Sequence, residues 1–154
     1  MKGKLRLQHE AMFNDTLDND SLKLFSRHNA GGDTANRYGG MGLAFGHDTY
    51  DVKEEVYHNV HKSIRSGKLP KPIPNGKWVG LRFDCKLEMP GKKFNVQGFI
   101  DYDINDKWVK ICDVDYTSNA PGVTEQLEDL YCWIRTNGPA KDIGFRNEKY
   151  IQLE

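Results

Sequence analysis

The clearest alternation of hydrophobic and polar positions in this chain runs from residue 76 to residue 115. Within residues 79–87 every second residue is apolar, and the residues between them are small, polar or charged. A period of two fits a strand with one buried face and does not fit a helix. The same alternation returns at 94–100, and a third apolar-rich run follows at 108–114, with polar turn sequences between the runs. We therefore expect an antiparallel meander of three strands with one buried face.

Shorter runs of the same kind indicate further strands along the chain. The expected strands are residues 3–13, 22–28, 39–47, 52–58, 131–136 and 142–153. Valines recur every fourth residue from 52 to 60, which would also suit a helix, but the β-branched and aromatic residues of this run favour a strand. Residues 63–74 are expected to form a long loop, because three prolines interrupt them. Such a strand-rich pattern with almost no helix predicts an all-β fold, a two-sheet antiparallel β-sandwich of the jelly-roll type.

The length of 154 residues suits a single domain spanning residues 1–154. Basic and acidic residues both number 22, so no overall basic field attracts nucleic acid, and any partner has to be recognised locally. No apolar run approaches the roughly 18–20 residues that span a bilayer, so membrane insertion is not expected. The first seven residues include basic residues but no apolar core, so no secretion signal is predicted.

The cysteines and acidic residues give no recognisable metal motif. The three cysteines, at positions 85, 112 and 132, cannot all pair with one another and show no zinc-ligand spacing. Cys85 falls on the apolar side of its strand, so we expect a small buried hydrophobic residue. Residues 101–106 resemble the opening of a calcium loop. An EF-hand is excluded, because Asp106 stands where glycine is needed and Cys112 where a bidentate glutamate is needed.

The polar positions of the central meander are candidates for binding. If the apolar residues of 79–87 and 94–100 fill the core, their neighbours share the outward face. These neighbours are Arg82, Asp84, Lys86, Asn95, Gln97 and Phe99. Amide, carboxylate and guanidinium groups exchange paired hydrogen bonds with the vicinal hydroxyls of a sugar, and an aromatic ring covers its apolar face. The same set is equally consistent with an ordinary solvated face.

Several segments, taken in order, resemble a known family. They are a strand ending in Arg27-His28, Val52-Lys-Glu-Glu-Val-Tyr-His58, Gly76-Lys-Trp-Val-Gly80, the run 94–101 with its Asp- and Asn-rich turn before Trp108-Val-Lys, and Asp142-Ile-Gly-Phe-Arg-Asn147. The pattern resembles the concanavalin A-like lectin/glucanase jelly rolls, most closely those related to polysaccharide lyases and laminin-G-like carbohydrate-binding modules. The resemblance covers residues 22–154 and is a fold signature more than an activity signature.

The resemblance implies non-catalytic binding of a polysaccharide or oligosaccharide on the concave sheet. The candidate residues are Arg27, His28, Lys53, Tyr57, His58, Arg82, Asp84, Gln97, Phe99, Trp133 and Arg135. Related jelly rolls sometimes hold a structural calcium ion, so a non-EF-hand site at 101–106 is left open, and no other cofactor is expected. An extracellular location is favoured by the resemblance alone.

Two alternatives to simple glycan binding remain. A lyase acting on an acidic glycan by β-elimination needs a group that neutralises the uronate, a base and an acid. The candidates are Arg27, Arg82 or Gln97 for neutralisation, His58 or His28 for the base, and Tyr57 or Tyr50 for the acid, with His58, Tyr57 and Arg82 as the favoured set. The chain lacks the Arg-Glu-Arg and Gln-Ile-His motifs of well-known alginate lyases, and it lacks the Glu-x-Asp-x-x-Glu motif of related hydrolases. The second alternative is a structural or protein-interaction module.

Overall fold

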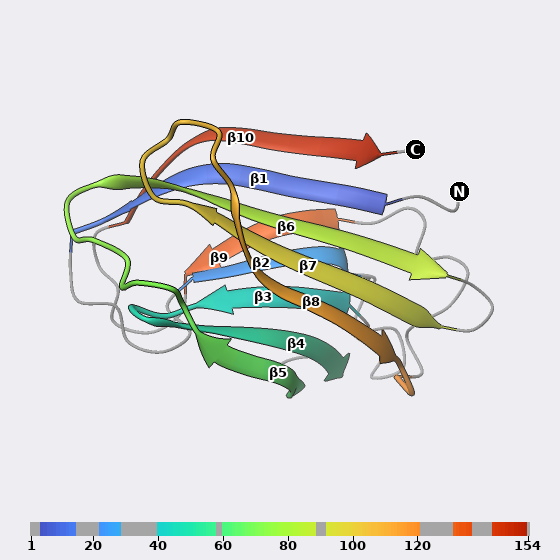
Figure 1. Ribbon diagram of the computed structural model, residues 1–154. Helices are drawn as coiled ribbons and strands as arrows, with labels where there is room; N and C mark the ends of the chain where they lie inside the picture. Colours follow the sequence, from blue (N-terminus) through green and yellow to red (C-terminus); the bar gives the residue numbers. More distant parts are fainter. Residues whose placement is uncertain are drawn as a thin grey trace.

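The chain folds into ten β-strands with no helix among the residues that the structure, a computed structural model, describes (Figure 1). The described residues are 4–14, 22–28, 40–57, 60–88, 92–120, 131–136 and 143–153, with only the backbone described at 23, 25–28, 57 and 131–136. The strands are β1 Lys4–Phe13, β2 Leu22–His28, β3 Gly40–Phe45, β4 Thr49–Tyr57, β5 Val60–Lys68, β6 Trp78–Glu88, β7 Lys93–Asp101, β8 Val109–Thr117, β9 Tyr131–Thr136 and β10 Ile143–Leu153. None of the described segments is a helix able to cross a membrane.

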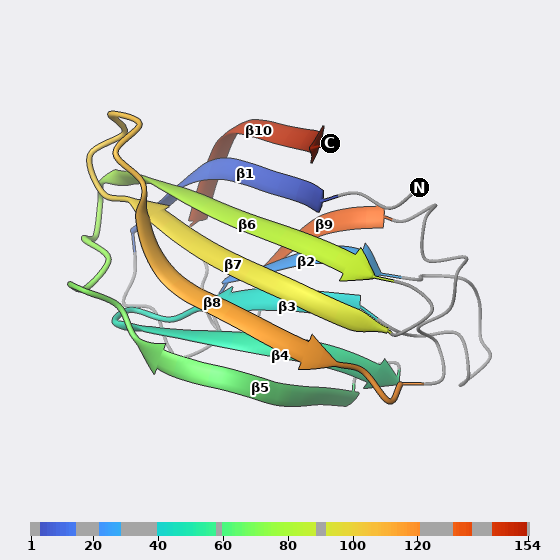
Figure 2. The same ribbon diagram turned by 45° about the vertical axis from the view of Figure 1, so that its right-hand side comes forward.

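The strands form two antiparallel five-stranded sheets. Sheet A has the order β10-β1-β6-β7-β8, and sheet B has the order β5-β4-β3-β2-β9. Figures 1 and 2 show the two sheets lying face to face, with β8 of sheet A passing over β4 on the side where β5 forms the edge of sheet B. The predicted all-β fold with a two-sheet antiparallel sandwich is therefore confirmed, while the finer jelly-roll assignment stays a prediction.

The core fills the space between the sheets and follows the alternation seen in the sequence. Every second residue of β6 from Val79 to Leu87 is buried, and so are Phe94, Val96 and Ile100 of β7. They pack against residues of sheet B such as Leu43 in one cluster. Burying an aliphatic or aromatic side chain of this size contributes about 1.5–3 kcal/mol to folding. The expected buried role of Cys85 is confirmed, since its side chain is fully covered.

β3 is the central strand of sheet B, and all six of its residues are buried. Met41, Leu43 and Phe45 belong to the core. The alternate positions, Gly40, Gly42 and Ala44, lie on the other face of the strand and carry at most a methyl group. The central strand therefore has no long side chain on the outer face of sheet B, although Gly40, Gly42 and Ala44 are themselves buried there.

The expected loop over residues 63–74 is wrong for its first part. Residues 60–68 form β5, which pairs antiparallel with β4, for example Ser63 with Lys53 and Ser66 with Asp51. β5 is an edge strand whose side chains are mostly exposed, so it carries no alternation of apolar and polar residues. The prolines begin only at Pro70, after the strand has ended.

Gly98 lets the two sheets approach each other closely. A Cβ atom at this position would lie 2.7 Å from Leu43 Cδ2 of sheet B and 2.8 Å from Cys112 Sγ of β8. Real Cβ atoms do not come this near to other heavy atoms, so the packing between β3 and β7 depends on a residue without a side chain.

Candidate functional site

The residues predicted from sequence do not form one site, because they divide between two sheets whose outer faces point in opposite directions. Sheet A carries Arg82 and Asp84 on β6 and Gln97 and Phe99 on β7. Sheet B carries Arg27 and His28 on β2, Lys53 and Tyr57 on β4, and Trp133 and Arg135 on β9. His58 lies outside the described residues. The single binding site expected from the sequence is thus corrected to two separate faces.

On sheet A, the carboxylate of Asp84 is enclosed by three basic side chains. Arg6 Nε and Nη2 lie 2.9 and 3.1 Å from its two oxygens, Arg82 Nε and Nη2 lie at 3.0 and 2.6 Å, and Lys4 Nζ at 3.3 Å. Burial by itself would raise the pKa of Asp84, but the hydrogen bonds and charges of Arg82 and Arg6 outweigh it and lower the pKa to about 2. Asp84 is therefore a buried counter-ion, and its predicted role as a ligand-binding side chain is corrected.

The neighbouring side chains of sheet A are also occupied by one another. Gln97 accepts a hydrogen bond from Lys4 Nζ at 2.6 Å and donates one to Asp113 at 3.0 Å. The guanidinium carbon of Arg82 lies 4.2 Å from the ring centroid of Phe99. Groups that already bind each other offer little to a ligand, so this part of sheet A is best explained as a network that stabilises the sheet.

A hollow of about 420 Å³ lies at the far end of the same face. Lys86, Glu88, Asn95, Asp115 and Thr117 are among its lining residues. Its polar groups are paired as well: Lys86 Nζ lies 2.6 Å from Glu88, and the Asn95 amide donates to Asp115 at 2.9 Å. The hollow is large enough for a small ligand, but these four polar side chains already bind one another.

The favoured lyase set of His58, Tyr57 and Arg82 is not assembled by the described residues. The Arg82 guanidinium lies on the outer face of sheet A against Asp84, whereas Tyr57 ends β4 in sheet B. The hydrophobic core lies between these two positions. Arg82 is therefore not placed to neutralise a substrate beside Tyr57.

On sheet B, strand pairing aligns the predicted residues in two rows. The first row is Trp133, Phe25, Gly42, Lys53 and Ser63, and the second is Arg135, Lys23, Ala44, Asp51 and Ser66. Residues directly opposite each other in antiparallel strands share a face. Both rows cross all five strands and pass over the small residues of β3. Three predicted residues, Lys53, Trp133 and Arg135, thus belong to one face.

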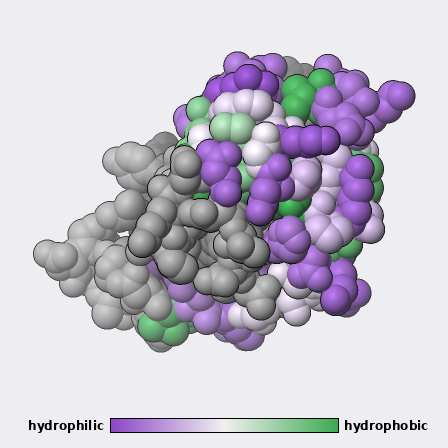
Figure 3. All heavy atoms as spheres, turned by 90° about the vertical axis from the view of Figure 1, so that its left-hand side faces the viewer, coloured by the Kyte–Doolittle hydropathy of each residue, from purple (hydrophilic) through white to green (hydrophobic). Residues whose placement is uncertain are grey.

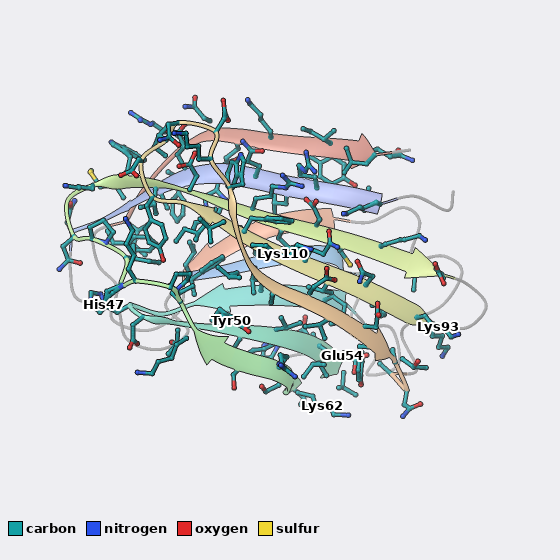
Figure 4. All side chains as sticks on the ribbon, viewed as in Figure 1. His47, Tyr50, Glu54, Lys62, Lys93 and Lys110 are labelled. Carbon is teal, nitrogen blue, oxygen red and sulfur yellow. The ribbon has the colours of Figure 1, made fainter. Side chains whose placement is uncertain are left out.

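A hollow of about 350 Å³ opens at the β4–β5 end of the second row. Its lining residues are Ala44, Gly46, Thr49, Tyr50, Asp51, Ser66 and Gly67, and Figure 4 shows Tyr50 at this part of the sandwich. The Asp51 carboxylate accepts a hydrogen bond from Ser63 Oγ at 2.6 Å and lies 3.3 Å from Lys53 Nζ. The hollow therefore combines a carboxylate, hydroxyl groups, the Tyr50 ring and the small residues Ala44, Gly46 and Gly67.

Sequence reasoning missed Asp51, Ser63 and Ser66. The sequence of residues 63–68 predicts a loop and therefore assigns neither serine to the face of a sheet. Asp51 carried a usable signal, since it stands two residues before Lys53 and residues two apart on a strand share a face.

A buried carboxylate at the other end of β4 joins the two sheets. Glu54 points toward the core and accepts hydrogen bonds from Tyr116 Oη at 2.8 Å and from Ser118 Oγ (Figure 4). Lys62 Nζ donates to the same tyrosine oxygen at 3.3 Å. Burial, the hydrogen bond to Glu54 and the charge of Glu54 raise the pKa of Tyr116 to about 12. This arrangement fastens β8 of sheet A to β4 and β5 of sheet B.

In the turn at residues 101–106, the side chain of Asp101 caps the backbone of the turn. The Asp101 carboxylate accepts the backbone N–H groups of Asp103 at 3.2 Å and Asn105 at 2.9 Å, and Asn105 Oδ1 accepts that of Lys107 at 3.1 Å. Across the described ranges, no group of three or more His, Cys, Asp or Glu side chains is placed to hold a metal ion.

Comparison of the chain with protein-family models, curated proteins and solved structures gives no match. The concanavalin A-like resemblance accordingly stays a prediction from the sequence. Function has to be argued from the chemistry of the two faces.

Proposed function

We propose that the protein binds carbohydrate, a polysaccharide or oligosaccharide, on the outer face of sheet B. The observation that carries this proposal is the pair of register rows, in which polar residues of β4 and β5 flank the small residues of β3. Long, shallow sites of this kind suit a chain of sugar rings, because no side chain on the central strand rises into its path.

The residue types in the rows match the chemistry of sugars. The hydroxyls of Thr49 and Ser66 line the hollow with the Asp51 carboxylate, which has acceptor positions beyond its contacts with Ser63 and Lys53, so these groups can exchange hydrogen bonds with vicinal hydroxyls. Phe25 and Trp133, which are paired in register, are residue types that cover the apolar face of a sugar ring. Hydrogen-bonding groups and aromatic residues on one face are typical of glycan binding.

The outer face of sheet A supports ligand binding less well. Its basic groups surround Asp84, and Gln97 and Asn95 are bonded to acidic neighbours. A sugar would have to displace these charge-assisted hydrogen bonds, which are roughly twice as strong as neutral ones.

Filling the hollow tests the proposal. Ser66 is exposed on the rim, so Ser66→Trp should block the hollow without disturbing the core. We expect the unmodified protein to bind at least one polysaccharide in affinity gel electrophoresis across neutral and acidic polymers, and Ser66→Trp to lose that retardation. Thr117→Trp, at an exposed position of the sheet A hollow, is the matched control and should bind normally.

Each other outcome has a definite meaning. Loss of binding in Thr117→Trp but not in Ser66→Trp would move the site to sheet A. A folded protein that no polymer retards would contradict carbohydrate binding and favour a structural or protein-interaction module.

A further inference from the structure

The charges of this neutral protein are strongly segregated along the chain. Residues 56–83 contain six of its 22 basic residues and none of its 22 acidic ones. The rest of the chain therefore has sixteen basic and 22 acidic residues, a net charge of −6. A local cluster of positive charges in a protein that is neutral overall indicates a surface that attracts a negatively charged partner.

Five of these six basic residues form one strip, because Arg82 lies apart on sheet A. The strip consists of Lys62, Arg65 and Lys68 on β5, followed by Lys71 and Lys77 in the connection to β6, and all five are exposed. In Figure 1 this stretch runs along the edge of sheet B and then across one end of the sandwich. The described surface at that end is mainly hydrophilic (Figure 3).

The spacing on β5 is regular. Lys62, Arg65 and Lys68 follow one another at intervals of three residues, which corresponds to about 10 Å along a strand. A register shift between Val52 and Lys53 pairs Lys62 with Glu54 and Arg65 with Val52, so these two cations extend from the core side of the edge strand, whereas Lys68 pairs with Thr49 and lies on the outer side. Exposed cations on both sides of β5 make this edge of sheet B positively charged along its length, which suits a linear polymer with repeating negative charges.

Most of this positive charge is not neutralised by the protein. Lys68 pairs with Asp48 at 3.3 Å, but its side chain is 83 % exposed, so the pair is weak. Lys62 contacts the Tyr116 hydroxyl at 3.3 Å, with Glu54 on the far side of that hydroxyl, and Lys71 Nζ lies 4.4 Å from the Tyr102 ring. Arg65 forms no ion pair with any residue in the described part of the chain.

Protection of an edge strand would explain part of the strip. Lysine and arginine on an exposed edge discourage pairing with another chain. This explanation does not cover Lys71 and Lys77, which lie beyond the strand. Nor does it explain why Lys68 adjoins the sheet B hollow, which is lined by its paired residue Thr49 and by its chain neighbour Gly67.

We infer that the strip of Lys62, Arg65, Lys68, Lys71 and Lys77 selects a linear anionic glycan, which runs along β5 with its carboxylate or sulfate groups against the cations. The inference rests on the proposed function and defines the class of its ligand. We prefer a glycan to a nucleic acid, because Lys68 lies beside Thr49, which lines the hollow proposed to bind sugar.

Matched pairs of polymers test the inference. The probes are polygalacturonate against its fully methyl-esterified form, and dextran sulfate against dextran, so carboxylate and sulfate are distinguished on unchanged backbones. We expect the charged member of at least one pair to bind more tightly, with an affinity that falls as salt is raised. The variant Lys62→Gln/Arg65→Gln should weaken that binding roughly 3- to 30-fold, from the loss of two exposed ion pairs.

A charge-matched control separates the strip from net charge. Lys86→Gln/Lys149→Gln removes two exposed lysines from β6 and β10 of sheet A, and its affinity should stay close to that of the unmodified protein. Equal binding to charged and neutral members, unchanged in Lys62→Gln/Arg65→Gln, would overturn the inference while leaving glycan binding intact. Binding to no polymer would overturn the proposed function as well. Equal affinity for a single-stranded oligonucleotide would also overturn the choice of a glycan.

Discussion

At the scale of single residues, His9 links protonation to stability. Its side chain is fully buried on β1, beside Phe145 at 5.7 Å between ring centroids and opposite Leu81, and neither ring nitrogen has a hydrogen-bond partner among the described residues. Burial lowers the pKa of His9 from 6.5 to about 4, because a charged imidazole would lose its hydration there.

This pKa predicts a loss of stability in mild acid. The unfolded chain takes up the proton near pH 6.5 and the folded protein only near pH 4, so stability is full above pH 6.5. The free energy of unfolding should then fall by roughly 3 kcal/mol as the pH drops from 6.5 to 4. Urea denaturation between pH 7 and pH 4 measures this. His9→Leu should flatten the profile, and an equally steep fall in that variant would place the acid sensitivity elsewhere.

The sequence predicts which way a residue faces, but it does not predict what covers it. The outward position of Asp84 followed from its place between buried Leu81, Phe83 and Cys85. The sequence does not predict that Asp84 is buried. Arg6, which covers it, comes from β1, 78 residues away, and only the pairing of β1 with β6 brings the two side chains together.

At the scale of strands, the close contact at Gly98 makes a quantitative prediction. Gly98→Ala would place a methyl group against Leu43 and Cys112, and overpacking of this kind costs about 1–3 kcal/mol. Urea unfolding of Gly98→Ala, Leu43→Ala and the double variant measures the effect. The double variant should be less destabilised than the sum of the single variants, because the shortened Leu43 makes room for the new methyl. Strict additivity would show that the contact is not the source of the cost.

Strands that bury one face were predictable, whereas β5 and the strand order were not. The sequence reveals β1, β6 and β7 through their alternation of apolar and polar residues, because one face of each strand is buried. β5 is mostly exposed and carries no such pattern. The register that aligns Ser63 with Lys53 depends on a β-bulge that local sequence does not reveal.

At the scale of the whole molecule, the candidate site belongs to a sheet rather than to a motif. The second row of sheet B draws Ala44 and Asp51 from the consecutive strands β3 and β4, and Arg135 from β9, which comes much later in the sequence. Sequence reasoning named Lys53, Trp133 and Arg135, which share this face, together with Arg82 and its neighbours, which do not. Residue type was enough to suggest sugar binding, but the division between two faces follows only from the topology.

Hydrogen bonds between β4 and the β8 region also hold the two sheets of the molecule together. Glu54 is buried, and its carboxylate depends on Tyr116 and Ser118 for hydrogen bonds. Tyr116→Phe would leave part of this acceptor unsatisfied, which we expect to lower the free energy of unfolding by about 1.5–3 kcal/mol, the usual contribution of a hydrogen bond to a charged group. Urea unfolding at pH 7 measures it, with Tyr150→Phe on exposed β10 as the matched control.

The high pKa of Tyr116 adds a second, independent test of this link. The folded protein holds the proton to about pH 12, whereas an unfolded tyrosine releases it near pH 10, so the contribution of Tyr116 is complete below pH 10 and is lost as the pH rises toward 12. The alkaline decline of stability should therefore be shallower in Tyr116→Phe than in Tyr150→Phe. If both variants declined alike, the hydroxyl would not be bonded to Glu54, and the sheets would be held together at this end by the core alone.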